Sequence, residues 1–158
     1  MKIMKIRNSY RLIAETTIPA PLEKAFDFFS HAENLQRITP PWVNFRFLTQ
    51  PPEEMSEGAR IFYSIRLHGL PLSWLTEITT WEPPFRFVDS QLKGPYKKWI
   101  HEHRFEALGD NTRMIDTVDY QLPLGGAGRL AHRLWVRRDI ENIFRFRQAI
   151  IEELYNKQ

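Results

Sequence analysis

The chain has 158 residues, of which 42% are hydrophobic and 26% charged, which fits a folded globular protein of one domain, residues 1–158. It contains no cysteine, which excludes disulfides, thiolate catalysis and cysteine-based metal sites. A net charge of +3 is too small to indicate nucleic-acid binding by itself. No stretch reaches the roughly 18 apolar residues of a membrane span, and the N-terminus lacks the apolar core of a signal peptide, so we expect a cytoplasmic protein.

The first part of the chain predicts one strand followed by two short helices. Residues 8–18 alternate between polar and apolar side chains, as a strand with one buried face does. Pro19 ends this strand, and Pro21 suits the first position of a helix, where its missing N–H is not needed. Residues 22–29 carry apolar side chains at helical spacing, and residues 34–38 are expected to add a second helical turn.

Six further strands are predicted in the middle of the chain. Clusters of Pro, Gly, Asp and Asn separate the alternating segments and mark turns between them. The short connections indicate antiparallel hairpins. The strands are expected at about residues 43–49, 59–68, 71–82, 85–92, 97–107 and 112–122.

The end of the chain predicts a long helix. Residues 124–128 contain three glycines and are expected to form a loop, although they lack the spacing of a phosphate-binding loop. Residues 129–156 contain neither Pro nor Gly and have apolar residues at helical spacing. The phase of this spacing shifts near residues 136–139, where we expect a bend or a change of packing partner.

The hairpin of residues 85–105 places polar side chains on a face predicted to be buried. Every second residue of a strand shares a face, and one face of the second strand is mostly charged, with Lys98, Glu102, Arg104 and Glu106, so its other face is expected to point inward. That inward face carries Trp99, His101, His103 and Phe105. By the same alternation Phe85, Phe87, Asp89 and Gln91 share a face, and Asp116 joins an apolar face of the last strand. Unpartnered buried polar groups cost about 1–3 kcal/mol each, so this interior predicts either a hydrogen-bonded network or a cavity wall.

The order of these elements and several motifs resemble a known superfamily. The motifs are IPAPLEKAFDFF at residues 18–29, NLQRITP at 34–40, GPYKKWIHEHRF at 94–105, DTVDYQLP at 116–123 and RLAHRLWVRRD at 129–139. The chain resembles the SRPBCC (START-related, Bet v 1-like) superfamily along nearly its whole length. Within it, the last three motifs are similar to an uncharacterised bacterial subgroup described as ligand-binding or cyclase/dehydrase-like.

This resemblance implies an α+β helix-grip fold, in which a curved antiparallel sheet of about seven strands wraps around a long C-terminal helix. Two short helices follow the first strand, and a cavity lies between the sheet and the long helix. The superfamily includes lipid and sterol carriers, polyketide aromatase/cyclases, quinone-binding proteins and plant hormone binders. The resemblance therefore implies binding of a small, largely apolar ligand that is lipid-, polyketide- or quinone-like.

The two inward histidines allow three interpretations. They could ligate a metal together with Asp89 or Asp116, although no metal or other cofactor is the favoured prediction. They could orient a ligand or act in acid–base chemistry, as in a polyketide cyclase/dehydratase, with His101, His103 and Asp116 as the catalytic candidates. They could also form a purely structural network. No nucleophile is paired with a base in the sequence.

The predicted ligand site combines this polar group with aromatic walls. Aromatic residues at such positions are more often core than ligand contacts, and Tyr96 could equally lie at the pocket mouth or cap the core. The candidate ligand-binding residues are Tyr63, Trp74, Phe87, Asp89, Gln91, Tyr96, Trp99, His101, His103 and Asp116.

Arginines concentrate on the predicted C-terminal helix. Such a helix could dock on an anionic membrane surface, but arginines beside an apolar stripe are usually a solvated face, which is the favoured interpretation. Basic residues interleaved with exposed aromatics, or a known motif, would be needed for nucleic acid, so no nucleic-acid partner is expected. The sequence predicts a small apolar molecule as the partner and leaves the oligomeric state open.

Overall fold

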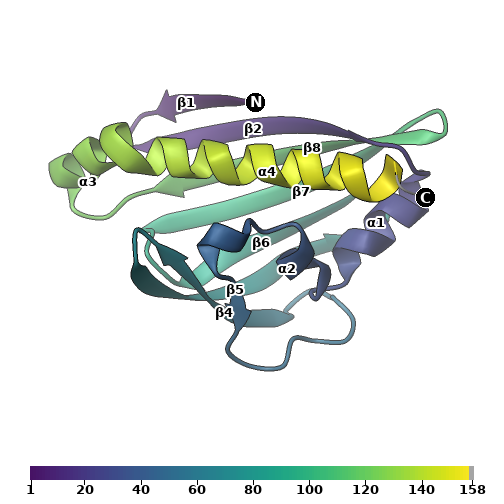
Figure 1. Cartoon of the computed structure of the whole chain (residues 1–158), viewed down its shortest axis with the longest axis horizontal. Coiled ribbons are helices and arrows are strands. Elements are labelled where there is room, and N and C mark those ends of the chain that lie inside the picture. The colour runs from purple at the N-terminus through teal and green to yellow at the C-terminus, as the bar shows by residue number, and fades with distance from the viewer. Residues whose placement is uncertain (157–158) are drawn as a thin grey trace.

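The computed structural model describes residues 1–156, in which an eight-stranded antiparallel sheet curves around one long helix (Figure 1). The strands are β1 (Lys2–Ile6), β2 (Ser9–Ile18), β3 (Arg46–Phe47), β4 (Arg60–Leu67), β5 (Leu70–Glu82), β6 (Arg86–Lys93), β7 (Lys98–Leu108) and β8 (Asn111–Gln121). The helices are α1 (Leu22–Ser30), α2 (Asn34–Arg37), the 3₁₀ turn η1 (Pro41–Val43), α3 (Gly125–Ala131), the π-helical turn η2 (His132–Val136) and α4 (Arg137–Asn156). This is the predicted helix-grip fold.

The sheet has the order β1-β2-β8-β7-β6-β5-β4-β3, so β2 pairs with the last strand and the others follow the chain as hairpins. Shifts in the register of β5 against β6, between Leu75 and Thr76 and between Ile78 and Thr80, interrupt the ladder. Such bulges bend and twist a strand. The strongly curved sheet leaves a concave face, and α4 crosses that face along its length (Figure 1).

All seven predicted strands are present, and β1 is an additional one. It forms an edge strand against β2 through a tight turn in which Arg7 has a φ of 52°. The turn, Arg7-Asn8, contains no glycine, so the usual sign of a two-residue hairpin loop is missing there. The strand expected at residues 43–49 is reduced to Arg46–Phe47 because the preceding residues form η1.

The glycine-containing segment is helical rather than a loop. α3 begins at Gly125, and Gly128 is buried where the helix packs against the backbone of Pro123. A Cβ at Gly128 would overlap the carbonyl oxygen of Pro123, so glycine permits this close approach. The phase shift expected at residues 136–139 corresponds to η2, since a π-turn inserts an extra residue into the helical repeat.

The predicted faces of β7 and β8 are confirmed, with one error on the strand before them. His101, His103 and Phe105 are buried on the concave face. Phe85 does not share that face: it precedes β6, which begins at Arg86, and its side chain is 59% exposed. None of the helices within residues 1–156 is long and apolar enough to cross a bilayer.

Candidate functional site

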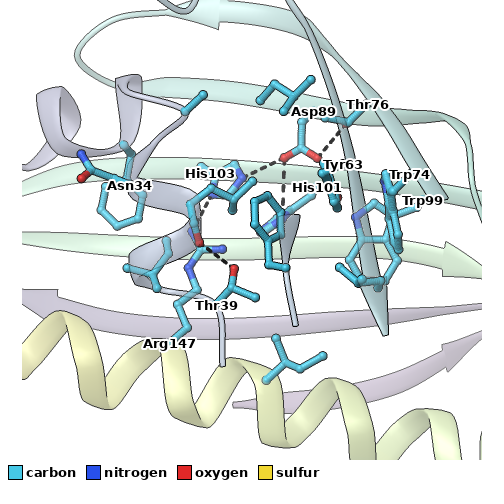
Figure 2. Close-up of a pocket in the computed structure, with 18 of the residues that line it drawn as sticks. Asn34, Thr39, Tyr63, Trp74, Thr76, Asp89, Trp99, His101, His103 and Arg147 are labelled. Atoms are coloured by element: carbon cyan, nitrogen blue, oxygen red, sulfur yellow. Dashed lines mark hydrogen bonds and ion pairs between the residues drawn. The ribbon is translucent and has the colours of Figure 1, made fainter. Parts of the chain in front are cut away.

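A cavity of about 190 Å³ lies between the concave face of the sheet and α4. The sheet forms one side of the cavity, and α4 on the opposite side contributes Ile140, Ile143, Phe144 and Arg147. Figure 2 shows Trp74 and Trp99 close together on one side of this pocket, with His103 and Arg147 towards the other. The wall is mostly apolar, and its charged side chains gather around the two histidines, while Asn34 and Thr39 add polar atoms from the segment of α2.

Cross-strand register assembles that polar region. On β7, His101 lies directly opposite Asp89 of β6, and His103 lies directly opposite Asp116 of β8. Opposed residues in an antiparallel pair have Cβ atoms about 4.5–5.5 Å apart, within reach of a side-chain contact. Arg147 reaches this region from α4, the yellow helix along the bottom of Figure 2. These five residues, from four elements, are referred to below as the His–Asp cluster.

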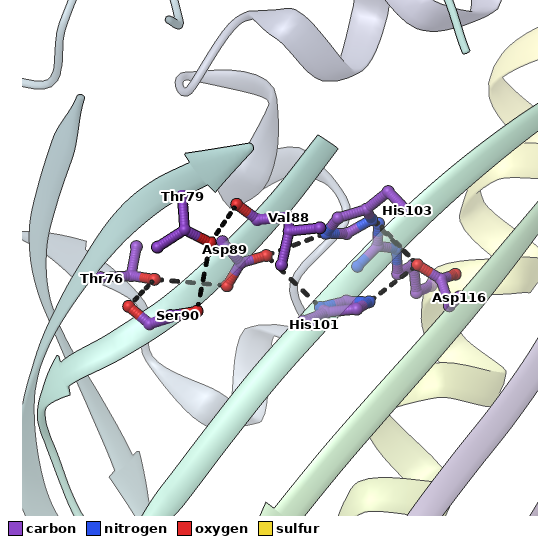
Figure 3. A network of polar contacts seen from close by, with 9 residues as sticks. Thr76, Thr79, Val88, Asp89, Ser90, His101, His103 and Asp116 are labelled. Atoms are coloured by element: carbon purple, nitrogen blue, oxygen red, sulfur yellow. Dashed lines mark hydrogen bonds and ion pairs between the residues drawn. The ribbon is translucent and has the colours of Figure 1, made fainter. Parts of the chain in front are cut away.

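The cluster is tightly hydrogen bonded. His101 Nε2 donates to Asp116 Oδ1 at 2.8 Å, and His103 Nε2 donates to Asp89 Oδ2 at 2.9 Å. Thr76 Oγ1 on β5 lies 3.3 Å from Asp89 Oδ1 and 3.1 Å from the carbonyl oxygen of Ser90, so these two acceptors share its one proton. Figure 3 shows Asp89 and Asp116 on opposite sides of the two imidazoles.

His103 Nδ1 occupies an unusual position between an anion and a cation. It lies 3.0 Å from Asp116 Oδ1 and 3.3 Å from Arg147 Nη2. A proton on this nitrogen would face the carboxylate, whereas a lone pair would accept from the guanidinium. The nitrogen therefore has a partner in either state.

Both carboxyl groups favour the ionised form in spite of burial. Burial raises the pKa of Asp116, but Arg147 and the two imidazoles outweigh that effect and hold the pKa well below its usual value. Burial also raises the pKa of Asp89, but the hydrogen bond from His103 and the charges around the carboxylate outweigh it, so the pKa lies below its usual value. Arg147 therefore offsets part of the negative charge that the two carboxylates bring into the cluster.

His101 differs from an ordinary histidine. Burial lowers its pKa to about 4, and the neighbouring His103 acts in the same direction, while Asp116 and Asp89 only partly oppose them. The imidazole is therefore neutral at pH 7, and its Nε2–H points at Asp116.

Arg147 belongs to the candidate site and was missed by sequence reasoning. Its guanidinium lies 3.6 Å from Asp116 Oδ1 and packs over the rings of Phe29 and Phe144, at 5.4 and 5.9 Å from their centroids. The signal was present, because Phe144, Arg147 and Ile151 follow one another at helical spacing on the buried face of α4. An arginine within an apolar stripe indicates an acidic partner inside.

Asp89, His101 and His103 could in principle hold a metal ion, because one ligand atom from each lies within 4.8 Å of the others. Two imidazoles on one metal at about 2.1 Å would have ring centroids roughly 4.6–5.3 Å apart. The centroids of His101 and His103 are only 3.7 Å apart. The rings would have to separate to bind a metal, so the present arrangement fits a hydrogen-bonded cluster better.

The structure brings most of the predicted site residues to the cavity. The residues from the predicted set that line it are Tyr63, Trp74, Phe87, Asp89, Tyr96, Trp99, His101 and His103. Asp116 lies behind the histidines and is 2% exposed. The rings form a continuous wall: Tyr63 stacks on Trp74 at 5.9 Å, and Trp74 meets Trp99 edge to face at 5.2 Å.

The prediction that Gln91 belongs to the polar group is wrong. Its Nε2 donates to the carbonyl oxygen of Tyr96 at 2.7 Å, and its Oε1 accepts from the Tyr96 N–H at 3.3 Å. Gln91 therefore fixes the turn between β6 and β7, and so positions Tyr96 at the cavity. Gln91 does keep the face of Asp89, since Gln91 pairs with Thr76 and Asp89 pairs with Ile78 in an uninterrupted register, but the turn takes up both ends of its amide.

The chain matches the family model of polyketide cyclase/dehydrase and lipid transport over residues 18–145. The chain belongs to this family. A comparison with curated protein sequences found no match.

Solved structures of the family's fold resemble the chain along most of its length. The aromatase/cyclase ZhuI from Streptomyces sp. R1128 aligns with a TM-score of 0.73 at 14% identity, covering 93% of each chain. A START superfamily protein from Mycobacterium smegmatis aligns with a TM-score of 0.68 at 14% identity, covering 91% of this chain and 98% of that one. The major latex-like protein 151 of Panax ginseng gives 0.58 at 17% identity, covering 85% and 97%. At these identities the likeness shows the fold alone.

Proposed function

We propose that this protein binds a small, largely apolar molecule in the cavity between the sheet and α4, and that the His–Asp cluster orients its polar end. The observation that carries the proposal is an apolar cavity with one polar region on its wall, formed by Asp89, His101, His103 and Arg147. Apolar walls with a few convergent polar groups are the general pattern of small-molecule sites. The family description, which includes lipid transport, supports the same conclusion.

The cavity volume limits the ligand. An apolar cavity of about 150 Å³ accepts benzene, so the roughly 190 Å³ available here suits a molecule of about one or two rings. Among lipid-, polyketide- and quinone-like ligands, this size favours an aromatic ring or quinone head over a whole lipid. A longer chain attached to that ring would have to leave the cavity.

The protonation of His101 favours orientation over catalysis by that residue. A general acid or base works best when its pKa is close to the operating pH, and the pKa of His101 is about 4. A neutral imidazole held by Asp116 still presents a fixed ring edge to a ligand. Binding is therefore the function that the geometry of His101 supports best.

A second candidate is a cyclase or dehydratase reaction in the same cavity. It is favoured by the position of His103 Nδ1, which has a partner both with and without a proton. In that case His103 would move the proton, with Asp116 and His101 as its supports. The family name and the aromatase/cyclase neighbour agree with this possibility.

Native mass spectrometry of the protein purified from its own host tests the binding proposal. We expect a stoichiometric adduct that extraction identifies as a small molecule with an aromatic or quinone ring. A protein that leaves its host empty, and that also shows no binding of aromatic probes such as 2-naphthol, would overturn the proposal.

A His103→Gln variant separates the two candidates once a ligand is known. For a binding protein, the variant changes the affinity and the bound molecule stays chemically unchanged. For an enzyme, the wild-type protein converts the ligand, and His103→Gln loses turnover while it retains most of the affinity.

A further inference from the structure

The start of the C-terminal helix exposes large apolar side chains on its outer surface. Leu130, Leu134 and Trp135 are 57%, 50% and 56% exposed, and Leu124, just before the helix, is 81% exposed. Leu130 and Leu134 are four residues apart and so lie on the same side of the helix, with Trp135 beside them. These four residues are called the apolar cluster below.

The opposite side of the same helical segment packs against the rest of the protein, which keeps the apolar cluster at the surface. Gly128 packs against the backbone of Pro123, and His132 is only 5% exposed. The ring of His132 stacks on Tyr10 at 3.5 Å, and its Nε2 forms a hydrogen bond of 2.8 Å with the hydroxyl of Tyr120. The helix therefore cannot turn its leucines inward without breaking these contacts.

Positive charge surrounds the apolar cluster. Residues 123–138 contain four arginines and no aspartate or glutamate. Arg137 pairs with Glu141 at 3.0 Å, whereas Arg129, Arg133 and Arg138 are exposed around the cluster. A helix with arginines on its polar face and leucine and tryptophan beside them has the composition of one that lies in a lipid interface.

We propose that the apolar cluster and its arginines dock this protein on the surface of an anionic lipid bilayer. Anionic headgroups complement the arginines, and the acyl region accepts the leucines and Trp135. A second copy of the chain fits less well, because a symmetric contact would bring the arginines of both copies together. α3 lies at the end of the molecule away from α1, so nothing within residues 1–156 covers this surface (Figure 1).

Docking would place the cavity close to lipid. The helix that carries the apolar cluster continues into α4, where Ile140 and Ile143 line the cavity only one to two turns further along. Membrane binding itself does not depend on the cavity being occupied. The two proposals can therefore fail separately.

Co-sedimentation of the full chain with vesicles tests the docking. We expect binding to vesicles of equal parts phosphatidylglycerol and phosphatidylcholine, little binding to pure phosphatidylcholine, and weaker binding at about 0.5 M than at about 0.05 M salt. Each arginine near an anionic surface contributes about 1 kcal/mol, or about fivefold, so Arg129→Gln/Arg133→Gln should lower the partition coefficient by about 25-fold. Leu134→Ser/Trp135→Ser should lower it by about tenfold or more.

Matched variants elsewhere provide the controls. Arg104→Gln/Arg113→Gln removes the same charge from the outer face of the sheet, and Trp42→Ser removes another exposed tryptophan, 58% exposed on η1. Both should keep most of the binding. No binding to the anionic vesicles, or equal losses in these controls, would overturn the proposal. Self-association of the chain that Leu134→Ser/Trp135→Ser abolishes, without lipid binding, would instead assign the surface to a second copy.

Discussion

His101 and His103 are two residues apart on β7, and together they reach carboxylates on both neighbouring strands. Register places Asp89 opposite one and Asp116 opposite the other. Arg147 then balances part of the negative charge from the other side of the cavity. Removing one member of such a buried ionic group leaves the others uncompensated, which explains why the polar residues are concentrated rather than scattered.

The lowered pKa of His101 makes stability depend on pH. An unfolded histidine has a pKa of about 6.5, so between pH 6.5 and about 4 the unfolded chain binds a proton that the folded His101 does not. The contribution of His101 to the free energy of unfolding should therefore be complete above pH 6.5. It should fall as the pH decreases towards 4, by up to about 1.4 kcal/mol per pH unit. His132, whose pKa burial also lowers, acts in the same direction. Urea denaturation at pH 7 and pH 5 measures the change.

A His101→Gln variant should flatten that dependence, because it removes the group that titrates only in the unfolded chain. His31→Gln, at an exposed position, is the control and should leave the slope unchanged. An unfolding free energy that is the same at pH 7 and pH 5 in the wild-type protein would contradict a lowered pKa at His101.

At the scale of elements, the C-terminal helix has two parts that differ in what they contact. α4 closes the cavity with its buried stripe, whereas α3 and η2 are anchored through Gly128 and His132 and carry the apolar cluster outside. The π-turn between them changes the phase of the helix. One helix therefore has a buried face that lines the cavity and an outward apolar face, which is the surface that we propose docks on lipid.

Close packing of Gly128 predicts a sharp difference between neighbouring glycines. Gly128→Ala should lower the free energy of unfolding by about 1–3 kcal/mol, since its Cβ would overlap the Pro123 carbonyl oxygen. Gly126→Ala is the matched control, because the nearest atom there is Arg129 Nη2 at 3.6 Å. That change should be neutral or raise the free energy by up to about 1 kcal/mol, as alanine is the better helix former. Urea denaturation of both variants measures these changes, and equal changes in the free energy of unfolding would argue against the tight contact at Gly128.

At the scale of the whole molecule, the cavity exists because a bent sheet and a straight helix do not fit together completely. Phe26, Phe29 and Phe105 fill the region beside α1 with packed rings. The region under the middle of α4 is left open between Tyr63, Trp74 and Ile143. The fold thus provides both a stable core and a space for a ligand.

Filling that space should abolish binding without unfolding the protein. Ile143→Trp introduces a larger ring from α4 at the cavity wall, and we expect the affinity for an aromatic probe such as 2-naphthol to fall by about tenfold or more. Ile100→Trp on the outer face of β7, where Ile100 is 37% exposed, is the control and should bind normally. Fluorescence titration gives the affinities and thermal unfolding checks the fold. Unchanged binding by Ile143→Trp would place the probe elsewhere.

The alternation of residues along single strands was sufficient to predict much of the candidate site. The two-residue period of a strand is a property of the backbone, so His101, His103 and Asp116 could be assigned to the inner face from sequence alone. The same rule failed for Phe85, outside the strand, and it could not show that the amide of Gln91 bonds to the turn at Tyr96. Alternation holds only where the ladder is regular.

The sequence by itself determined the order of the elements, the inward histidines and the aromatic walls, because each of these follows from periodicity and turn residues within short segments. The helix-grip fold was implied by the resemblance of its motifs to a known superfamily. Only the tertiary structure decided that Arg147 completes the His–Asp cluster, that Gln91 serves a turn, and that Leu130, Leu134 and Trp135 stay outside. The outcome for Gln91 depends on the turn between β6 and β7, and those for Arg147 and for the apolar cluster depend on how the C-terminal helix lies across the sheet. That placement is set by contacts between residues far apart in the chain, such as Tyr10 and Tyr120 with His132, which no local pattern encodes.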